Sequence, residues 1–107
     1  MIDMQAHLLF ITNRIVQLYN ESNKLRGITA FWREDDETAC LGFYLDGPVS
    51  DEDIEDASDL ATGIISHFPE GFLEEEFFRL DYPQPLPESP FWGYRRPDSD
   101  PESIKPG

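Results

Sequence analysis

The sequence has few of the residues that most often carry chemistry. It contains one cysteine, Cys40, and two histidines, His7 and His67. One cysteine cannot form a disulfide within the chain, and these three residues lack the close spacing of a zinc site. There is also no glycine-rich phosphate loop and no Gly-x-Ser-x-Gly nucleophile motif. We therefore expect no catalytic residue, no metal site and no cofactor, so the chain is not predicted to be an enzyme, and Cys40 is interpreted as a core thiol.

Long apolar runs are absent as well. The longest one near the N-terminus covers residues 8–11, far short of the length that crosses a bilayer. No charged segment followed by an apolar one forms a secretory leader there. Together with the single cysteine, this pattern predicts a cytoplasmic protein that does not bind membranes.

Basic residues are scarce. Lys and Arg total 8 against 22 Asp and Glu, which gives a net charge of −14. A surface of this sign repels nucleic acid and anionic membranes, because both are bound through Lys and Arg. It attracts basic proteins and speeds their encounter. The partner we expect is therefore a basic protein and not a nucleic acid, while the oligomeric state stays open.

What is present is a pattern of helices and strands suited to one small domain. Apolar residues three and four positions apart, Leu8, Ile11, Ile15 and Leu18 among them, predict a helix over residues 3–24. Alternating residues predict a hairpin of strands 28–33 and 38–45 around the polar turn 34–37. A second helix is expected over residues 51–68, with Ser50 as its cap and Ile54, Leu60 and Ile64 in its buried stripe. A last strand is expected over residues 72–82.

This order predicts an α+β fold, helix-strand-strand-helix-strand. A right-handed crossover that skips one position would place the first strand in the middle. We therefore predict a three-stranded antiparallel sheet in the order 2-1-3, with both helices on one face. Residues 1–82 would form the domain.

Residues 83–107 form a proline-rich tail in this interpretation. Seven of these 25 residues are proline, a composition that argues against regular structure. Phe91, Trp92 and Tyr94 lie within four residues of one another. Because large aromatic side chains are costly to leave in water, we expect this extended tail to pack partly on the domain or to contact a partner.

Acidic residues supply the candidate binding site. Between Glu34 and Phe78 there are fifteen acids and no Lys or Arg. Glu52, Glu55, Asp56 and Asp59 are spaced at three and four, so they share one helix face, and their mutual repulsion costs about a few tenths of a kcal/mol per pair. A solvated face that only aids solubility is the simpler interpretation. The candidate partner-binding residues combine the turn, the helix face and two aromatics: Asp35, Asp36, Glu37, Glu52, Glu55, Asp56, Asp59, Tyr44 and Trp92.

Two acidic clusters could also hold a cation. The turn residues 35–37 and the run 74–76 are dense enough in carboxylates to do so weakly. Neither has the Asp-x-Asp-x-Asp-Gly spacing of a calcium loop. The sequence therefore predicts no metal ligands.

With its acidic block over residues 34–76, the turn acids and the acidic helix face, the chain resembles immunity proteins of bacterial toxin systems, which include contact-dependent growth inhibition and colicin-type systems. The resemblance implies binding to a nuclease toxin, whose active site is basic because it holds phosphate. The acids would then stand in for the nucleic-acid backbone. Two alternatives remain: a nucleic-acid mimic that inhibits a DNA-binding enzyme, and a small adaptor subunit that presents residues 83–90 to an aromatic groove.

Overall fold

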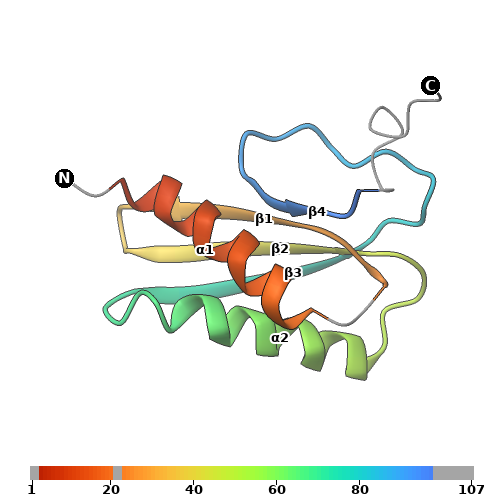
Figure 1. Cartoon of the computed structure of the whole chain (residues 1–107), viewed down its shortest axis with the longest axis horizontal. Coiled ribbons are helices and arrows are strands. Elements are labelled where there is room, and N and C mark those ends of the chain that lie inside the picture. Colours follow the sequence, from red (N-terminus) through yellow and green to blue (C-terminus); the bar gives the residue numbers. More distant parts are fainter. Residues whose placement is uncertain (1–2, 21–22, 98–107) are drawn as a thin grey trace.

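A computed structural model describes residues 3–20 and 23–97. These residues form, in chain order, α1 (Met4–Tyr19), β1 (Leu25–Arg33), β2 (Thr38–Leu45), α2 (Asp51–Ile65), β3 (Phe72–Arg79) and β4 (Trp92–Arg95). The strands make one mixed sheet in the order β3-β2-β1-β4, with α1 and α2 packed on it (Figure 1). The α+β class and the two predicted helices are confirmed, although the helices end at Tyr19 and Ile65, before the predicted ends at residues 24 and 68. Neither of these helices has the length and apolar character needed to cross a membrane.

Local capping signals explain where the helices begin. Asp3 caps α1 by accepting a hydrogen bond from the Ala6 amide. Ser50 and Asp53 form a capping box at the start of α2, where three acids also favour the positive end of the helix dipole. Two residues of the predicted buried stripes are exposed, one at the end of α1 and one at the start of α2. Leu18 is 59% exposed near the end of α1, and Ile54 is 36% exposed in the first turn of α2.

The predicted hairpin is present, and its first strand is longer than expected. β1 pairs antiparallel with β2 and begins at Leu25, so Gly27 lies in a strand and does not cap α1. The pairing register shifts between Leu25 and Gly27, which makes Arg26 an extra residue of β1. The turn over residues 34–37 lies where the polar sequence predicted it.

The predicted sheet of three antiparallel strands in the order 2-1-3 is wrong. β3 pairs directly with β2, in parallel and without a register shift from Thr38↔Phe72 to Leu45↔Arg79. This register stacks Phe77 on Phe43 on one side of the sheet, at 5.5 Å between ring centroids, and Phe78 on Tyr44 on the other, at 4.9 Å. Aromatic contacts on both sides stabilise the adjacent pairing of β2 and β3.

The place beside β1 belongs to β4, which comes from the proline-rich segment where no regular structure was expected. The Ala30 amide donates to the Phe91 carbonyl at 2.8 Å, and the Arg96 amide donates to the Arg26 carbonyl at 2.7 Å. A register shift in β4 lets Tyr94 pack against the core while Trp92 lies on the opposite face of the sheet. The four residues of β4 contain no proline, so each can join the ladder.

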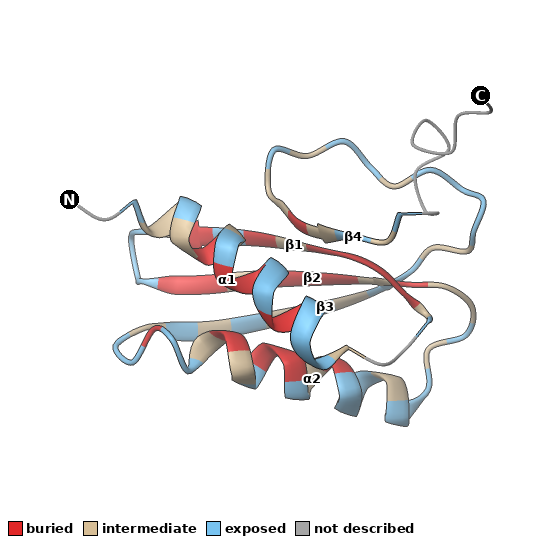
Figure 2. Ribbon diagram, viewed as in Figure 1, coloured by how far each residue is buried: buried red, intermediate tan, exposed pale blue. Residues whose placement is uncertain are grey.

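The hydrophobic core lies between the helices and the sheet (Figure 2). β1 and β2 contribute every second residue to it, including Ile28, Ala30, Leu41 and Phe43, each at most 2% exposed. α1 and α2 cover this face with their buried residues, Leu8, Ile11, Ile15, Val16, Ala57, Leu60, Ala61 and Ile64. The opposite face of the sheet has no helix over it among the described residues, and we call it the open face.

Candidate functional site

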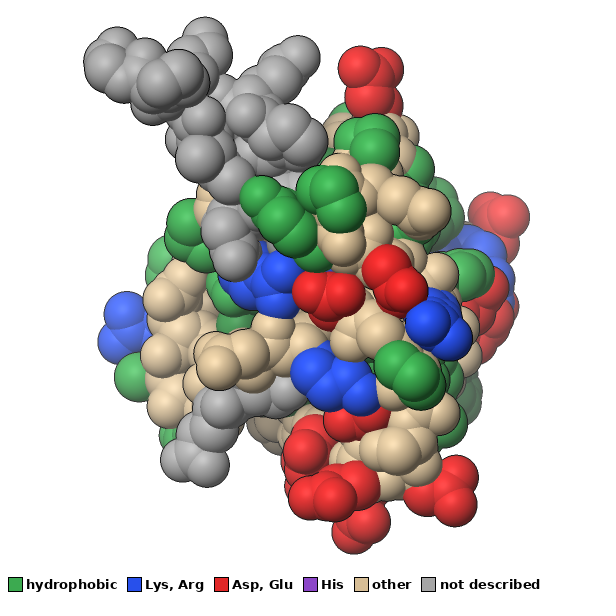
Figure 3. Space-filling model, turned by 90° about the vertical axis from the view of Figure 1, so that its right-hand side faces the viewer, with side chains coloured by type: hydrophobic (Ala, Val, Ile, Leu, Met, Phe, Trp, Pro, Cys, Tyr) green, Lys and Arg blue, Asp and Glu red, His purple; other side chains and the backbone are tan. Residues whose placement is uncertain are grey.

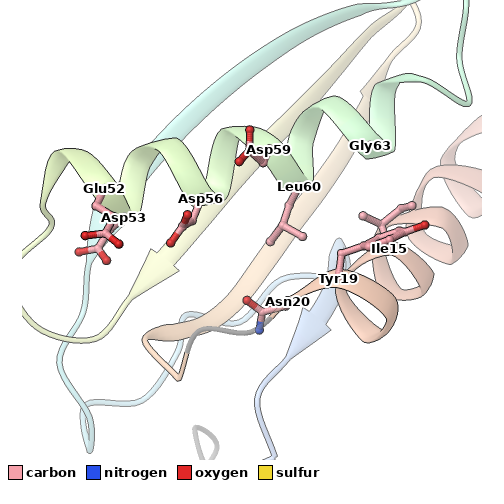
Figure 4. Close-up of a pocket in the computed structure, with 9 residues that line it drawn as sticks. All are labelled: Ile15, Tyr19, Asn20, Glu52, Asp53, Asp56, Asp59, Leu60 and Gly63. Carbon is pink, nitrogen blue, oxygen red and sulfur yellow. The ribbon is translucent and has the colours of Figure 1, made fainter.

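A groove of about 660 Å³ runs between α1 and α2. Asp56 and Leu60 point from α2 toward α1, and Tyr19 and Ile15 of α1 form the opposite wall of the groove (Figure 4). The groove is lined by Ile15, Tyr19, Asn20, Glu52, Asp53, Asp56, Asp59, Leu60 and Gly63. It therefore combines four carboxylates with an aromatic ring and aliphatic side chains.

Only one of the four carboxylates has a basic partner among the described residues. Lys24 Nζ lies 2.5 Å from Asp53 Oδ2 and also donates to the Pro48 carbonyl at 2.6 Å. Within residues 3–20 and 23–97, no Lys or Arg forms an ion pair with Glu52, Asp56 or Asp59. These three side chains are exposed, so the groove presents unneutralised negative charge.

The predicted acidic face of the second helix coincides only in part with the groove. Glu52, Asp56 and Asp59 line the groove, but Glu55 does not. Glu55 lies one turn before Ser58, whose hydroxyl donates to Glu75 of β3 at 2.7 Å. Glu55 is exposed and, at about 100° per residue, lies within about 60° of Glu52, Asp59 and Ser58 alike, so it points to solvent between the two flanks of α2.

The three predicted turn acids lie far from the groove acids of the first turns of α2. β2 runs from the turn at residues 34–37 to the start of α2, so the two sets occupy opposite ends of the sheet (Figure 1). Asp36 is held by two hydrogen bonds from Arg33, at 2.9 and 2.7 Å, and the Arg33 guanidinium lowers the pKa of Asp36. Arg33 also pairs with Glu74. Asp35 and Glu37 are exposed in the same turn.

The two predicted aromatic residues lie on the open face. The Tyr44 ring packs between Phe78, at 4.9 Å, and Trp92, at 5.2 Å. Trp92 fits against β1 because Gly27 has no side chain there: a Cβ would lie 2.7 Å from the indole ring. Tyr44 and Trp92 are less exposed than Phe31 and Phe78 on the same face, which are 40% and 38% exposed. Burial raises the pKa of the Tyr44 hydroxyl.

At the end of the molecule where α2 begins, acidic and basic side chains alternate across the middle of the surface, and acids gather at its lower edge (Figure 3). Three ion pairs join bases and acids in this part of the chain: Lys24 with Asp53, Arg79 with Asp81, and Arg96 with Asp46. All three bases lie outside the acidic block of the sequence. The fold therefore neutralises some acids of the block, while others stay unpaired.

The MafI2 immunity protein family matches residues 19–98, which include α2 and all four described strands. The chain belongs to this family. The resemblance to immunity proteins of bacterial toxin systems is thereby confirmed, and the function of a MafI2 immunity protein implies a toxin protein as its partner. A comparison with the curated proteins found no match.

In this MafI2-family chain, the sequence pattern missed the α1 wall of the groove. Tyr19 and Asn20 contribute to that wall, together with Ile15. A large aromatic at the end of a helix is a weak signal, and nothing local shows that α1 packs beside α2. Within the described residues, no three His, Cys, Asp or Glu side chains are grouped to hold a metal ion. The groove thus offers charge and apolar contact, which are the means of binding a protein.

Lys24 and Asp53 tie the start of β1 to α2 beside the groove, and this contact should be sensitive to pH. The Lys24 ammonium, followed by the Ser50 amide, lowers the pKa of Asp53 from 3.8 to about 2. Because the pKa is lower in the folded state, Asp53 stabilises the fold above pH 4 and loses this effect as the pH falls toward 2. The difference in unfolding free energy between wild type and Asp53→Asn should therefore shrink between about pH 5 and pH 2.

Urea unfolding at several pH values measures this difference. Asp51→Asn is the matched control, since Asp51 also lies in the first turn of α2 but has no basic partner among the described residues. A difference between wild type and Asp53→Asn that stays constant from pH 6 to about pH 2 would contradict the assignment.

Proposed function

We propose that this MafI2-family immunity protein neutralises a basic toxin of the nuclease type through the groove between α1 and α2. The observation that carries the proposal is that Glu52, Asp56 and Asp59 line one groove without a basic partner among the described residues. A nuclease holds phosphate with Lys and Arg side chains. Carboxylates at the groove would occupy those cations in place of the nucleic-acid backbone.

The apolar lining supports the same function. Tyr19, Ile15 and Leu60 lie beside the carboxylates. The aliphatic stem of a Lys or Arg side chain can pack on such residues while its charged end meets a carboxylate. Tyrosine is also enriched among the residues that dominate protein–protein binding energy. The groove therefore suits long basic side chains better than free metal ions.

The proposal includes the setting in which the protein acts. A toxin that degrades nucleic acid inside the cell must be met there, so we place this protein in the bacterial cytoplasm. Contact-dependent growth inhibition is the kind of system in which it would serve. Inhibition by occupation of the active site needs no catalytic residue in the inhibitor.

A charge-neutralised variant tests the groove. The combined substitutions Glu52→Gln, Asp56→Asn and Asp59→Asn should weaken binding to the toxin at least about tenfold, because they remove the charges that face its cations. The toxin used is the one whose growth inhibition this chain relieves, in a catalytically inactive form. The affinity and the association rate are measured by titration and stopped flow at two salt concentrations. The wild-type association rate should fall with salt, and that of the variant should depend on salt less.

The control removes equal charge elsewhere: Glu34→Gln, Glu70→Gln and Glu88→Gln, all at exposed positions. This control should bind within about threefold of wild type, since rim charges far from an interface contribute little. Equal affinity of both triple variants, with each folded, would show that the groove acids serve only solubility.

A further inference from the structure

β3 forms one edge of the sheet, so no described strand pairs with the backbone N–H and C=O groups on its outer side. It is eight residues long, contains no proline, and keeps an unbroken register with β2. No other described strand pairs with it. None of its eight side chains is fully buried. Bulges, prolines and short length are common devices that prevent pairing at an edge, and β3 has none of them.

Two backbone hydrogen bonds at the ends of β3 show which of its backbone groups point outward. The Phe72 amide donates to the Glu37 carbonyl at 2.9 Å, and the Leu80 amide donates to the Leu45 carbonyl at 2.8 Å, both toward β2. Backbone groups alternate in direction along a strand. The even-numbered residues therefore bond to β2, and the N–H and C=O groups of Leu73, Glu75, Phe77 and Arg79 point away from the sheet.

Carboxylates border this edge on both faces of the sheet. Glu74 and Glu76 lie on the open face, while Glu75 lies on the helix side, where it accepts a hydrogen bond from Ser58. The two arginines nearby are already engaged, Arg33 with Asp36 and Glu74, and Arg79 with Asp81.

This charge distribution selects the strand that can be added. A second copy of the chain, paired antiparallel through β3, would bring residues 74–76 against the same residues of its partner. Like charges directly opposite each other destabilise a sheet. A strand with Lys or Arg at alternating positions would instead meet Glu76, and Glu74 with its partner Arg33, on the open face, and Glu75 on the helix side.

We propose that the free edge of β3 receives an extended, basic strand of the toxin, which adds a fifth strand to the sheet. Backbone hydrogen bonds to residues 73, 75, 77 and 79 supply affinity, and the flanking carboxylates select basic side chains. This inference rests on the proposed function only for the basic character of the toxin. β3 and the groove lie on opposite flanks of α2, so a toxin that engages both surfaces straddles this helix.

Amide hydrogen exchange, resolved by residue with NMR, tests the added strand. In the free chain, the amides of Leu73, Glu75 and Phe77 should exchange at least about tenfold faster than those of Glu74, Glu76 and Phe78, which bond to β2. Binding of the inactive toxin should slow the exchange of the outward amides by at least about tenfold. Unchanged outward amides in the complex would overturn the proposal. Outward amides that are protected in the free chain, and more so at higher concentration, would overturn it in favour of a second copy.

A proline substitution separates the backbone from the side chain. Glu75→Pro removes an outward N–H and no bond to β2, a position at which an edge strand tolerates proline. It should weaken binding at least about tenfold, whereas the control Glu75→Ala, which also removes the carboxylate, should weaken it less than about threefold. Equal effects of the two variants would overturn the backbone contact.

The exchange result on the wild-type chain stands even where Glu75→Pro fails to fold. Protection of the outward amides, together with weakened toxin binding by the groove variant, supports both proposals. Protection with no effect of the groove substitutions supports the added strand and rejects the groove. The two failures are thus distinguishable.

Discussion

Cutting the chain after Tyr82 should abolish its cooperative unfolding transition, although the sequence pattern marks residues 1–82 as the domain. The cut removes β4, which is the second neighbour of β1 beside β2. It also removes the contact of Trp92 with Gly27 and that of Gly93 with Thr12. Gly93 packs so closely on α1 that a Cβ at this position would lie 2.6 Å from the Thr12 side chain. The shortened chain would expose Ile28 and one side of α1. A small domain has a net stability of only about 5–15 kcal/mol, which such a loss can exceed.

Circular dichroism and urea denaturation measure this effect. The control supplies residues 83–107 as a separate peptide, which should restore a cooperative transition in proportion to its concentration. A truncated chain that unfolds at the urea midpoint of the full chain would show that residues 1–82 fold alone.

Arg26→Ala should lower the unfolding free energy by about 3 kcal/mol or more. Arg26 is fully buried although it is charged. Its guanidinium donates to the Leu80 carbonyl at 2.7 Å and lies 5.7 Å from the centre of the Tyr82 ring. It thereby joins β1 to the segment that follows β3, across the width of β2. Its removal leaves a cavity and an unsatisfied carbonyl at this end of the sheet.

The matched control is Arg14→Ala on the exposed side of α1, which should change stability by no more than about 0.5 kcal/mol. Urea titrations of both variants, with equal m-values, make the comparison direct. A loss below about 1 kcal/mol for Arg26→Ala would mean that water replaces its hydrogen bonds.

Local signals predicted the elements, and non-local pairing decided what they failed to predict. The Ser50 cap and the alternation over residues 38–45 located α2 and β2 at their observed starts. The strand order depends on whether β3 pairs with β1 or β2, and no local pattern contains that choice. β4 was missed because proline content described the whole tail, whereas residues 92–95 contain none.

The candidate site shows the same division. The sequence identified the acids and their excess over bases, but not which of them are paired. Arg33 and Lys24 come from outside the acidic block and bind Asp36 and Asp53 within it. The helical spacing grouped Glu55 with Glu52, but only Glu52 lines the groove that α2 forms with α1. Net charge can be read from a sequence, but local charge depends on tertiary neighbours.

The pairing of β1 with β4 also sets when the sheet can be completed during synthesis. β1 emerges early from the ribosome, but its second neighbour is the last of the described strands to be made. Until then, the backbone groups of β1 that pair with β4 in the finished sheet have no strand to bond to. A chain still under synthesis therefore cannot complete this sheet until residues 92–95 have been made.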